Sequence, residues 1–416
     1  MRVLIVSSTY HPVVGGVQTV THNLAKHLVR KGHEVQVVTN HYPRSLPVRE
    51  SLDGVSVERM LFLTPGLSSL KRKRPDLFLA SFYFYPNSLW RLRKIVRSFR
   101  PDVVNVHFPD HQIPFVLALR GLINVRLVVS LHGHDIERLN IDDLVPNENG
   151  ISGLRYQRPA VDRLRSILVR ADAVTACSQY LLEKAIRFEP SIGSKGRVIH
   201  NGIDLTRFRN KTAYVSSRSY ILGLGRLVRA KGFDLLLDAF AQTGSEKTDL
   251  IIAGAGEERA ALENQARELG LEGRVHFFGP ATAEQAVSLL NGCMLVVIPS
   301  RSESFGIVAL DALAAGKPIL ATSVGGLVEL LTDVYKEFGD GIRASSATFG
   351  RYQDVATVAQ GVMLVDPNAQ ALAEGLSKAL HSNPRETCRV EPRMDRYSWD
   401  RVGREYEAVM MSGAPV

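Results

Sequence analysis

The sequence predicts an α/β protein built from two doubly wound domains, and three observations lead to this prediction. Short runs rich in β-branched residues alternate with longer helical patterns, as expected for parallel βαβ units. The alternation breaks at a polar, basic stretch, RFRNKTAYVSSRS at 207–219, and then starts again. At 416 residues the chain is also long for one hydrophobic core.

The predicted strands give both halves the same architecture. In the first half they are RVLIVS (2–7), EVQVVT (34–39), DVVNVH (102–107), RLVVSL (126–131), DAVTAC (172–177) and RVIHN (197–201), with helical patterns between several of them, such as Val17–Arg30 and Gln157–Arg170. In the second half they are YILGLG (220–225), DLIIAG (249–254), RVHFFG (274–279), MLVVIP (294–299), PILAT (318–322) and GVMLVD (361–366). We therefore expect domains at 1–205 and 206–392, whose strands direct their carboxyl ends toward one cleft.

Two segments fall outside this alternation. SWDRVGREYEAVM, at 398–410, places Trp399, Val402, Tyr406 and Val409 at helical spacing. It predicts a closing helix within 393–416 that crosses back to the first domain. Residues 334–358 lack clean periodicity, so a surface insertion is expected there.

Composition indicates an ordinary globular protein, with 45% hydrophobic and 22% charged residues. Cys177, Cys293 and Cys388 lie far apart without metal-type spacing, which favours free thiols in a reducing cytoplasm. No apolar run approaches the roughly 20 residues that span a bilayer. MRVLIVSS at the start is interpreted as a buried strand rather than a signal peptide. A cytoplasmic protein is expected.

The segment IPSRSESFGIVALDALAAGKPILAT, at 298–322, contains two carboxylates eight residues apart, Glu303 and Asp311. Glu303 falls in the loop after a predicted strand, and Asp311 falls in the helix 307–315 that follows. Ligands of open α/β sheets bind at such loops. The helix starts with the N–H groups of Ser304, Phe305, Gly306 and Ile307, which can meet an anion or hydroxyls. The alternative is that Glu303 only caps the helix and Asp311 faces solvent.

A second loop carries cations. In LGLGRLVRAKGF a strand ends at Gly225, followed by Arg226 and then by Lys231. Glycine permits close backbone approach, and two cations in one loop can clamp a diphosphate. The alternative is a solvated basic loop.

Glycine loops follow three further strands: GGVQTV at 15–20, AGAGEER at 253–259 and FFGPAT at 277–282. Gly15 and Gly16 open a helix whose bare N-terminus a phosphate or sugar can approach. Gly254 is a candidate for the floor of a nucleotide pocket. None matches the dinucleotide-binding or P-loop pattern, so each is also compatible with a plain turn.

SLHGHDIE carries His132, His134 and Asp135 after a predicted strand. No other segment supplies further ligands at the usual spacing, which disfavours a metal site. His132 is better interpreted as a hydrogen-bonding or proton-handling group.

Together these motifs resemble the GT-B class of retaining, nucleotide-sugar-dependent glycosyltransferases, in the group marked by an E-x7-E motif (family 4-like). The resemblance runs from GGVQTV to YSWDRVGREYEAV, and its most specific parts are GLGRLVRAKG and PSRSESFGIVALDALAAGKPILATSVGG. VIHNGID at 198–204 resembles the family's segment that closes the first domain. The resemblance implies the GT-B fold, two Rossmann-like domains facing each other across a cleft.

By this resemblance, Arg226 and Lys231 match the pair that holds the donor diphosphate. Glu303 matches the residue that binds hydroxyls of the donor sugar, and Asp311 stands where the family has a ribose-binding Glu. The remaining matches are His132 beside the donor sugar, Gly15 and Gly16 under the phosphates, Gly225 and Gly254 near the nucleotide, and the N–H groups of Ser304, Phe305, Gly306 and Ile307 at the sugar or diphosphate.

The implied reaction moves a hexose-type sugar from a nucleotide-sugar, UDP or GDP first, to an acceptor hydroxyl with retention. Cleavage of the sugar–phosphate bond builds negative charge on the diphosphate, which preorganised cations and helix N–H groups stabilise. No cofactor and no metal are expected, because Arg and Lys can fill this role.

The first hundred residues are basic, with 16 Lys and Arg against 5 Asp and Glu. Residues 68–100 hold nine basic residues, one acidic residue (Asp76), and the aromatics Phe78, Phe82, Tyr83, Phe84, Tyr85, Trp90 and Phe99. SLWRLRKIVRSFR predicts a basic amphipathic helix, typical of anionic membrane surfaces. A solvated face with Phe and Trp in the core is the alternative. We expect a lipid-linked or envelope-polysaccharide acceptor on the cytoplasmic leaflet.

Three other functions stay open. A soluble small-molecule acceptor fits the same reaction class. A GT-B-type nucleotide-sugar epimerase needs no acceptor, although GRLVRAKG with ESFGIVALD favours transfer. A nucleic-acid-binding protein is disfavoured, because the basic charge is confined to one quarter of the chain and no nucleic-acid module accompanies it.

Overall fold

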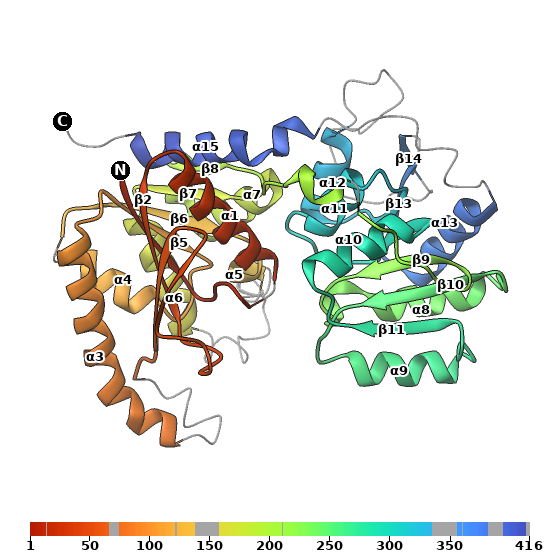
Figure 1. Ribbon diagram of the computed structural model, residues 1–416, viewed down its shortest axis with the longest axis horizontal. Helices are drawn as coiled ribbons and strands as arrows, with labels where there is room; N and C mark the ends of the chain where they lie inside the picture. Colours follow the sequence, from red (N-terminus) through yellow and green to blue (C-terminus); the bar gives the residue numbers. More distant parts are fainter. Residues whose placement is uncertain are drawn as a thin grey trace, which may run out of the picture. The chain divides into compact units, whose positions relative to one another are not determined.

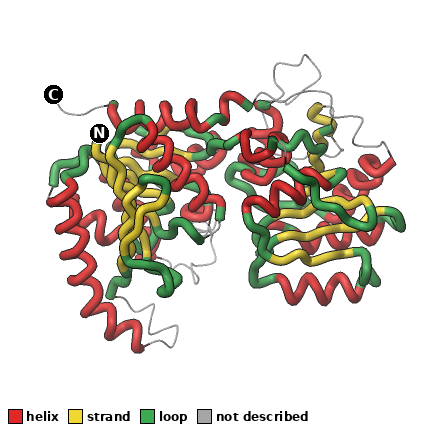
Figure 2. Tube along the Cα trace, viewed as in Figure 1, coloured by secondary structure: helices red, strands yellow, loops and turns green. Residues whose placement is uncertain are grey.

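The computed structural model describes residues 1–13, 15–65, 75–120, 123–137, 158–209, 211–334, 356–359, 361–381 and 394–412. The chain forms two compact units, residues 1–202 with 399–416, and residues 203–398. The predicted limits, 205 and 393, lie within a few residues of these. Each unit is an α/β domain in which helices pack against one largely parallel sheet (Figures 1 and 2).

The first unit contains an eight-stranded sheet in the order β3-β4-β2-β1-β5-β6-β7-β8. Its strands are β1 (Arg2–Ser7), β2 (Glu34–Asn40), β3 (Arg49–Leu52), β4 (Val55–Met60), β5 (Val103–His107), β6 (Arg126–Leu131), β7 (Ala173–Ala176) and β8 (Gly196–Val198). Its helices are α1 (Gly16–Arg30), α3 (Pro75–Phe99), α4 (Ile113–Arg120), α5 (His134–Glu137), α6 (Arg158–Arg170), α7 (Gln179–Phe188) and α15 (Trp399–Met411). The strand order reverses at β1, as in a doubly wound domain.

The second unit contains a seven-stranded sheet in the order β11-β10-β9-β12-β13-β15-β14. Its strands are β9 (Ser219–Leu224), β10 (Thr248–Ala253), β11 (Val275–Gly279), β12 (Leu295–Ile298), β13 (Ile319–Thr322), β14 (Ala356–Ala359) and β15 (Val362–Val365). Its α-helices are α8 (Phe233–Gln242), α9 (Arg259–Glu268), α10 (Ala283–Gly292), α11 (Ile307–Ala314), α12 (Gly325–Asp333) and α13 (Ala369–His381). Here the order reverses at β9.

Every strand named from the sequence is confirmed, because continuous apolar runs such as LVVI in β12 are buried along their whole length. The sequence missed β3 and β4, which form an antiparallel pair at the sheet edge. Their charged residues hide the pattern: Glu58 and Arg59 are both buried in β4.

Two further predictions need correction. The basic helix is longer than 88–100, since α3 runs from Pro75 to Phe99 with Pro86 inside it. Most of the predicted insertion lies outside the described residues, but its last residues belong to β14, which pairs antiparallel with β15. A strand at this position is part of the sheet, not a surface insertion.

The closing helix α15 belongs to the first unit and packs beside α1 (Figure 1). Trp399, Val402 and Tyr406 are buried there, as their helical spacing predicts. Close packing explains a glycine in the middle of this helix, because a Cβ on Gly403 would lie 2.1 Å from the His27 ring. Burial of these apolar side chains therefore fixes α15 on the first unit.

Candidate functional site

The predicted donor-binding residues of the second unit lie at its topological switch point. The parallel strands β9 and β12 are neighbours in the sheet. Gly225, Arg226 and Lys231 follow β9, whereas Glu303 follows β12. A doubly wound sheet opens a crevice outside the carboxyl ends of such a strand pair. The two motifs that the sequence singled out are therefore brought together.

The closest contact between these loops joins Lys231 and Glu303. Nζ of Lys231 donates a hydrogen bond to Oε2 of Glu303, with side-chain exposures of 24% and 16%. Oγ of Ser300 donates to the same oxygen over 3.4 Å. The backbone carbonyl of Glu303 accepts from the N–H of Gly326, 2.9 Å away in α12. Glu303 therefore does not act as a simple helix cap; its carboxylate faces the lysine.

A second ion pair joins the loop that carries Glu303 to the start of α8. Both terminal nitrogens of Arg301 donate to the carboxylate of Asp234, each over 2.6 Å. Burial alone raises the pKa of Asp234, but the hydrogen bonds and charge of Arg301 lower it on balance. The N–H of Arg301 also donates to the carbonyl of Ala230 over 2.8 Å. This bidentate pair, which the sequence analysis missed, fixes the loop that carries Lys231.

Glycine is required where the loops after β9 and β10 meet. The N–H of Gly225 donates to the carbonyl of Ala253 over 3.0 Å, and φ of Gly254 is 154°. A Cβ on Gly254 would lie 1.8 Å from the carbonyl oxygen of Gly225. No side chain fits between these backbones, so the glycines set how closely the loops approach each other.

Helix α11 begins next to Glu303. Gly306 is its N-cap with φ 99° and ψ 58°, in the left-handed region. A Cβ there would lie 2.8 Å from Cδ1 of Leu327. Ser304 and Phe305 are buried before the helix, and Ile307 is its first residue. The positive end of the helix dipole therefore lies in the loop that holds Glu303.

Asp311 lies within α11 and is half-buried, so it does not match the solvent-facing alternative. Burial raises its pKa to about 6, and the nearby charge of Arg207 opposes that shift. A carboxyl with this pKa is partly protonated near neutral pH. Arg226, by contrast, is exposed in its loop.

In the first unit, His132 is the end of a chain of hydrogen bonds at the carboxyl ends of β5 and β6. Nδ2 of Asn105 donates to Oγ of Ser130 over 3.0 Å, so its Oδ1 is an acceptor. That oxygen is hydrogen-bonded to Nε2 of His107, and Nδ1 of His107 lies 2.9 Å from Nε2 of His132. The sequence analysis missed His107 and Asn105. His107 is the last residue of β5, which is comparable to the position of His132 just after β6.

This chain fixes the protons on both rings. Since Oδ1 of Asn105 can only accept, Nε2 of His107 carries a proton and Nδ1 does not. Nε2 of His132 must then donate to His107, which leaves Nδ1 of His132 as an acceptor. Burial lowers the pKa of His132 to about 4, so the ring is neutral near pH 7. Burial also lowers the pKa of His107 well below its usual value, and the charge of His132 adds to this effect.

The two neighbours of His132 in the motif do not form a metal site. The Asp135 carboxylate accepts from the N–H groups of His132 (3.0 Å), Gly133 (2.8 Å) and Ile136 (3.1 Å). The Asp135 carboxylate therefore holds the turn that leads into α5. Among the described residues, no group of three His, Cys, Asp or Glu side chains could hold a metal ion.

The glycine loop before α1 is closed by a side chain. Gly15 is the N-cap of α1, and its carbonyl accepts from the N–H of Thr19 over 3.0 Å. A Cβ on Gly15 would lie 2.3 Å from Oε1 of Gln18, whose Nε2 donates to Thr9 over 2.7 Å. Gly16 is the first residue of the helix. Gln18, which the sequence analysis missed, shapes this loop as much as the glycines do.

Comparisons with known families agree with this geometry. Residues 14–207 match the family described as Glycosyltransferase Family 4, and residues 204–393 match Glycosyl transferases group 1. An uncharacterized glycosyltransferase of Methanocaldococcus jannaschii is 28% identical over 97% of this chain and 96% of its own. A D-inositol 3-phosphate glycosyltransferase of Corynebacterium urealyticum is 26% identical over 97% of this chain and 94% of its own.

A solved structure shares the fold. HepE from Anabaena in complex with UDP-glucose superposes with a TM-score of 0.71 at 19% identity, covering 99% of this chain and 100% of that one. This likeness confirms two Rossmann-like domains with parallel sheets, the architecture of GT-B proteins.

Proposed function

Because the two halves of the chain belong to Glycosyltransferase Family 4 and to the group 1 glycosyl transferases, we propose that this glycosyltransferase moves a hexose from a UDP- or GDP-sugar to an acceptor hydroxyl with retention of configuration. The observation that carries the proposal is the pairing of Lys231 with Glu303 at the switch point of the second unit, where the loop of Lys231 also carries the exposed Arg226. Such a site offers cations for a diphosphate and a carboxylate for sugar hydroxyls.

In this proposal, Arg226 and Lys231 stabilise the negative charge that grows on the diphosphate as the sugar–phosphate bond breaks. Glu303 accepts hydrogen bonds from hydroxyls of the departing sugar. The N-terminal N–H groups of α11 face the same charge, and the exact fit of Gly225 and Gly254 keeps the backbone close to the nucleotide. These cations supply the electrostatic stabilisation, so the proposal needs no cofactor and no metal.

Asp311 is proposed to bind the nucleotide ribose, in the second acidic position of an E-x7-E motif. A carboxyl with a pKa of about 6 accepts hydroxyl protons well only after it ionises. His132 is proposed to contact the transferred sugar as a neutral group. Its role is therefore hydrogen bonding rather than charge stabilisation.

A screen of UDP-, GDP-, ADP- and dTDP-sugars by thermal shift and slow hydrolysis tests the reaction class. We expect nucleotide-sugars of one base to raise the melting temperature of the protein. We also expect slow hydrolysis to release the sugar of that donor when no acceptor is present. The anomeric configuration of the first product, read by NMR, tests retention. A protein that neither binds nor hydrolyses any of these donors would refute the proposed activity.

For the acceptor, we propose a lipid-linked or envelope glycan at an anionic membrane surface, which α3 contacts. Helix α3 exposes Leu79 (69%), Phe82 (58%), Tyr83 (68%) and Trp90 (63%), so the alternative in which these rings enter the core does not hold for Phe82 or Trp90. Lys94 and Arg97 follow on the exposed part of the helix. Exposed apolar rings flanked by cations favour an interfacial helix. Lys71–Arg74, which precede α3 in the sequence, lie outside the described residues.

Sedimentation with neutral and anionic vesicles, at low and high salt, tests the membrane contact. Phe82→Asp with Tyr83→Asp should abolish recovery with anionic vesicles while the fold persists, because both side chains are already exposed. Equal recovery of the protein with neutral and anionic vesicles would contradict the proposed contact with an anionic membrane. Among the described residues, no helix is long and apolar enough to span a bilayer.

A soluble acceptor is the second candidate, because a relative that matches over nearly the whole chain is named for D-inositol 3-phosphate. The acceptor that stimulates donor turnover distinguishes a membrane-bound acceptor from a soluble one. Product analysis with a single nucleotide-sugar separates both from an epimerase, which would yield a new nucleotide-sugar without any acceptor.

A further inference from the structure

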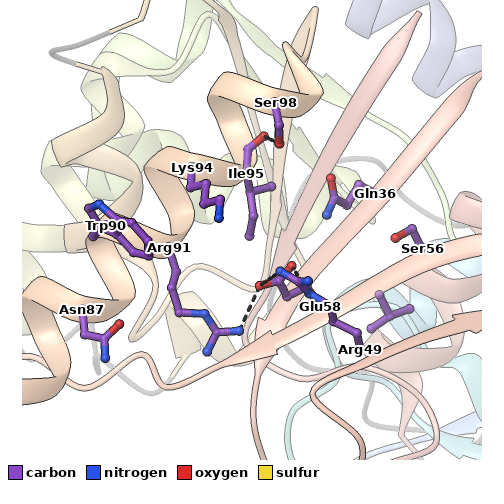
Figure 3. A pocket seen from close by; sticks show the side chains of 11 residues that line it. Gln36, Arg49, Ser56, Glu58, Asn87, Trp90, Arg91, Lys94, Ile95 and Ser98 are labelled. Atoms are coloured by element: carbon purple, nitrogen blue, oxygen red, sulfur yellow. Dashed lines mark hydrogen bonds and ion pairs between the residues drawn. The ribbon is translucent and has the colours of Figure 1, made fainter.

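A cavity of about 470 Å³ lies in the first unit between α3 and the strands β2, β3 and β4 (Figure 3). It reaches Gln36, near the start of β2, whereas the candidate site residues follow the carboxyl ends of strands. The cavity is therefore distinct from the loops that carry Gly15, Gly16 and His132. Its lining residues are Gln36, Arg49, Ser56, Val57, Glu58, Asn87, Trp90, Arg91, Lys94, Ile95 and Ser98.

A buried carboxylate organises the charges of this cavity. Glu58 accepts hydrogen bonds from Nε of Arg49 (3.0 Å) and from Nη2 of Arg91 (2.9 Å). Its side chain is 5% exposed, whereas those of Arg49 and Arg91 are 73% and 31% exposed. Figure 3 shows both guanidinium groups converging on Glu58 from opposite walls. The carboxylate is enclosed, so the charge that a ligand would meet is positive.

Lys94, which is exposed, adds a third cation to the lining. Its Nζ lies 5.6 Å from the centroid of the Trp90 ring. The lining thus carries three cations and one carboxylate, and neutral polar groups come from Gln36, Ser56, Asn87 and Ser98. Guanidinium groups held in place by a buried partner are preorganised for a phosphate, and amides and hydroxyls can bind the hydroxyls of a polyol.

The cavity opens beside the exposed apolar face of α3. Asn87, Arg91, Lys94 and Ser98 are spaced by four, three and four residues, which places them on one line along the helix. Leu79, Tyr83 and Trp90 lie on the adjoining line and are exposed. When this apolar line inserts into a membrane, the lipid headgroups lie at the level of the cavity. Trp side chains are common at the headgroup level of membranes.

We propose that the cavity binds the phosphodiester headgroup of an anionic lipid whose alcohol bears free hydroxyls. Arg49, Arg91 and Lys94 hold the phosphate, and the polar lining holds the hydroxyls. The proposal rests on the membrane contact of the proposed function but not on its chemistry. A headgroup with its own ammonium is disfavoured, because that charge would enter among three cations.

Phosphatidylcholine vesicles carrying equal mole fractions of phosphatidylglycerol or phosphatidylserine test the proposal, since each lipid adds one negative charge. We expect about fivefold tighter binding to phosphatidylglycerol, the gain of roughly one additional net hydrogen bond. Surface charge alone predicts equal binding to both. Equal binding by the wild-type protein would therefore overturn the proposal, even if membrane contact and donor turnover were both observed.

Lys94→Gln and Arg97→Gln form a matched pair. Both remove one charge from an exposed position of α3, but only Lys94 lines the cavity. Lys94→Gln should abolish the headgroup preference, whereas Arg97→Gln should weaken binding to both lipids equally. An identical effect of the two variants on the preference would refute the site.

Glycerophosphoglycerol, the headgroup without acyl chains, distinguishes a lipid from a free phosphate ester. We expect it to displace the protein from vesicles only at far higher concentration than the lipid itself, because it lacks the apolar contact with α3. Binding of this soluble ester as tight as binding to the vesicles would overturn the assignment to a lipid.

Discussion

Nζ of Lys231 donates a hydrogen bond to Oε2 of Glu303, so an ion pair joins the loops that follow two adjacent strands, β9 and β12. Two groups that the proposed function assigns to different parts of one donor thus contact each other directly. In the proposed function, donor binding replaces this pair, with the lysine turning to the diphosphate and the carboxylate to the sugar. The exchange makes separate predictions for the two residues.

Lys231→Ala is expected to lower kcat by at least about a hundredfold, because the charge on the leaving diphosphate loses a preorganised cation. Lys247→Ala is the matched control, since Lys247 is exposed just before β10, at the amino end of the sheet. Steady-state kinetics with the best donor measure both. A loss no larger than that of Lys247→Ala would contradict the diphosphate clamp.

Glu303→Gln should separate sugar binding from nucleotide binding. The glutamine no longer attracts Lys231 as an ion, so binding of the free nucleoside diphosphate should be unchanged or tighter. Turnover of the nucleotide-sugar should fall, because the sugar hydroxyls lose a charged acceptor. Calorimetry with UDP or GDP, set beside donor hydrolysis, gives the two readouts. Parallel losses of nucleotide affinity and turnover would mean that Glu303 serves only to hold the loop.

The loops that carry most of the predicted residues follow from sequence, because each of these loops comes after an apolar strand. A short run such as LVVI in β12 predicts a buried strand, and the loop after it falls at the carboxyl edge of the sheet. Position in the chain therefore placed Lys231 and Glu303 at one switch point.

The missed residues have no comparable signal. Arg301 and Asp234 lie far apart in the chain and pair only once the loops are folded. His107 and Asn105 lie inside an apolar strand, where their contacts with β6 depend on the register between β5 and β6. Burial of β4 with Glu58 and Arg59 likewise depends on partners from other elements, so its charged residues concealed a strand.

Gly254→Ala is expected to lower the free energy of unfolding by about 3 kcal/mol, since the new Cβ would lie 1.8 Å from a backbone oxygen and φ is 154°. Gly270→Ala is a suitable control. Its φ is 67°, but nothing lies within 4 Å of the added Cβ, so only a conformational cost of about 1 kcal/mol is expected. Chemical denaturation measures both. Equal losses would show that the loops after β9 and β10 can separate without cost.

Asp311 should make stability depend on pH. Its pKa rises from 3.8 when unfolded to about 6 in the folded protein, so between these values the folded protein holds a proton that the unfolded chain releases. Its contribution to the free energy of unfolding is therefore most favourable below about pH 4, and falls by up to about 3 kcal/mol as pH rises through 6. The stability of Asp311→Asn relative to wild type should therefore be higher near pH 7 than at pH 4. Urea unfolding of both proteins at the two pH values measures this, and a difference that does not change with pH would contradict the raised pKa of Asp311.

His107 is predicted to be a positioning residue for His132. With His107 present, Nε2 of His132 carries the proton and Nδ1 is the acceptor. His107→Phe removes the acceptor for that proton, so both tautomers of His132 should become populated. His107→Gln can present an amide oxygen to His132 and an N–H to Asn105, and should restore a single tautomer. Nitrogen-15 spectra of labelled histidine, with the His132 signals assigned by their loss in His132→Gln, report the tautomer without any need for activity. A single tautomer retained in His107→Phe would refute the relay, whatever the effect on turnover.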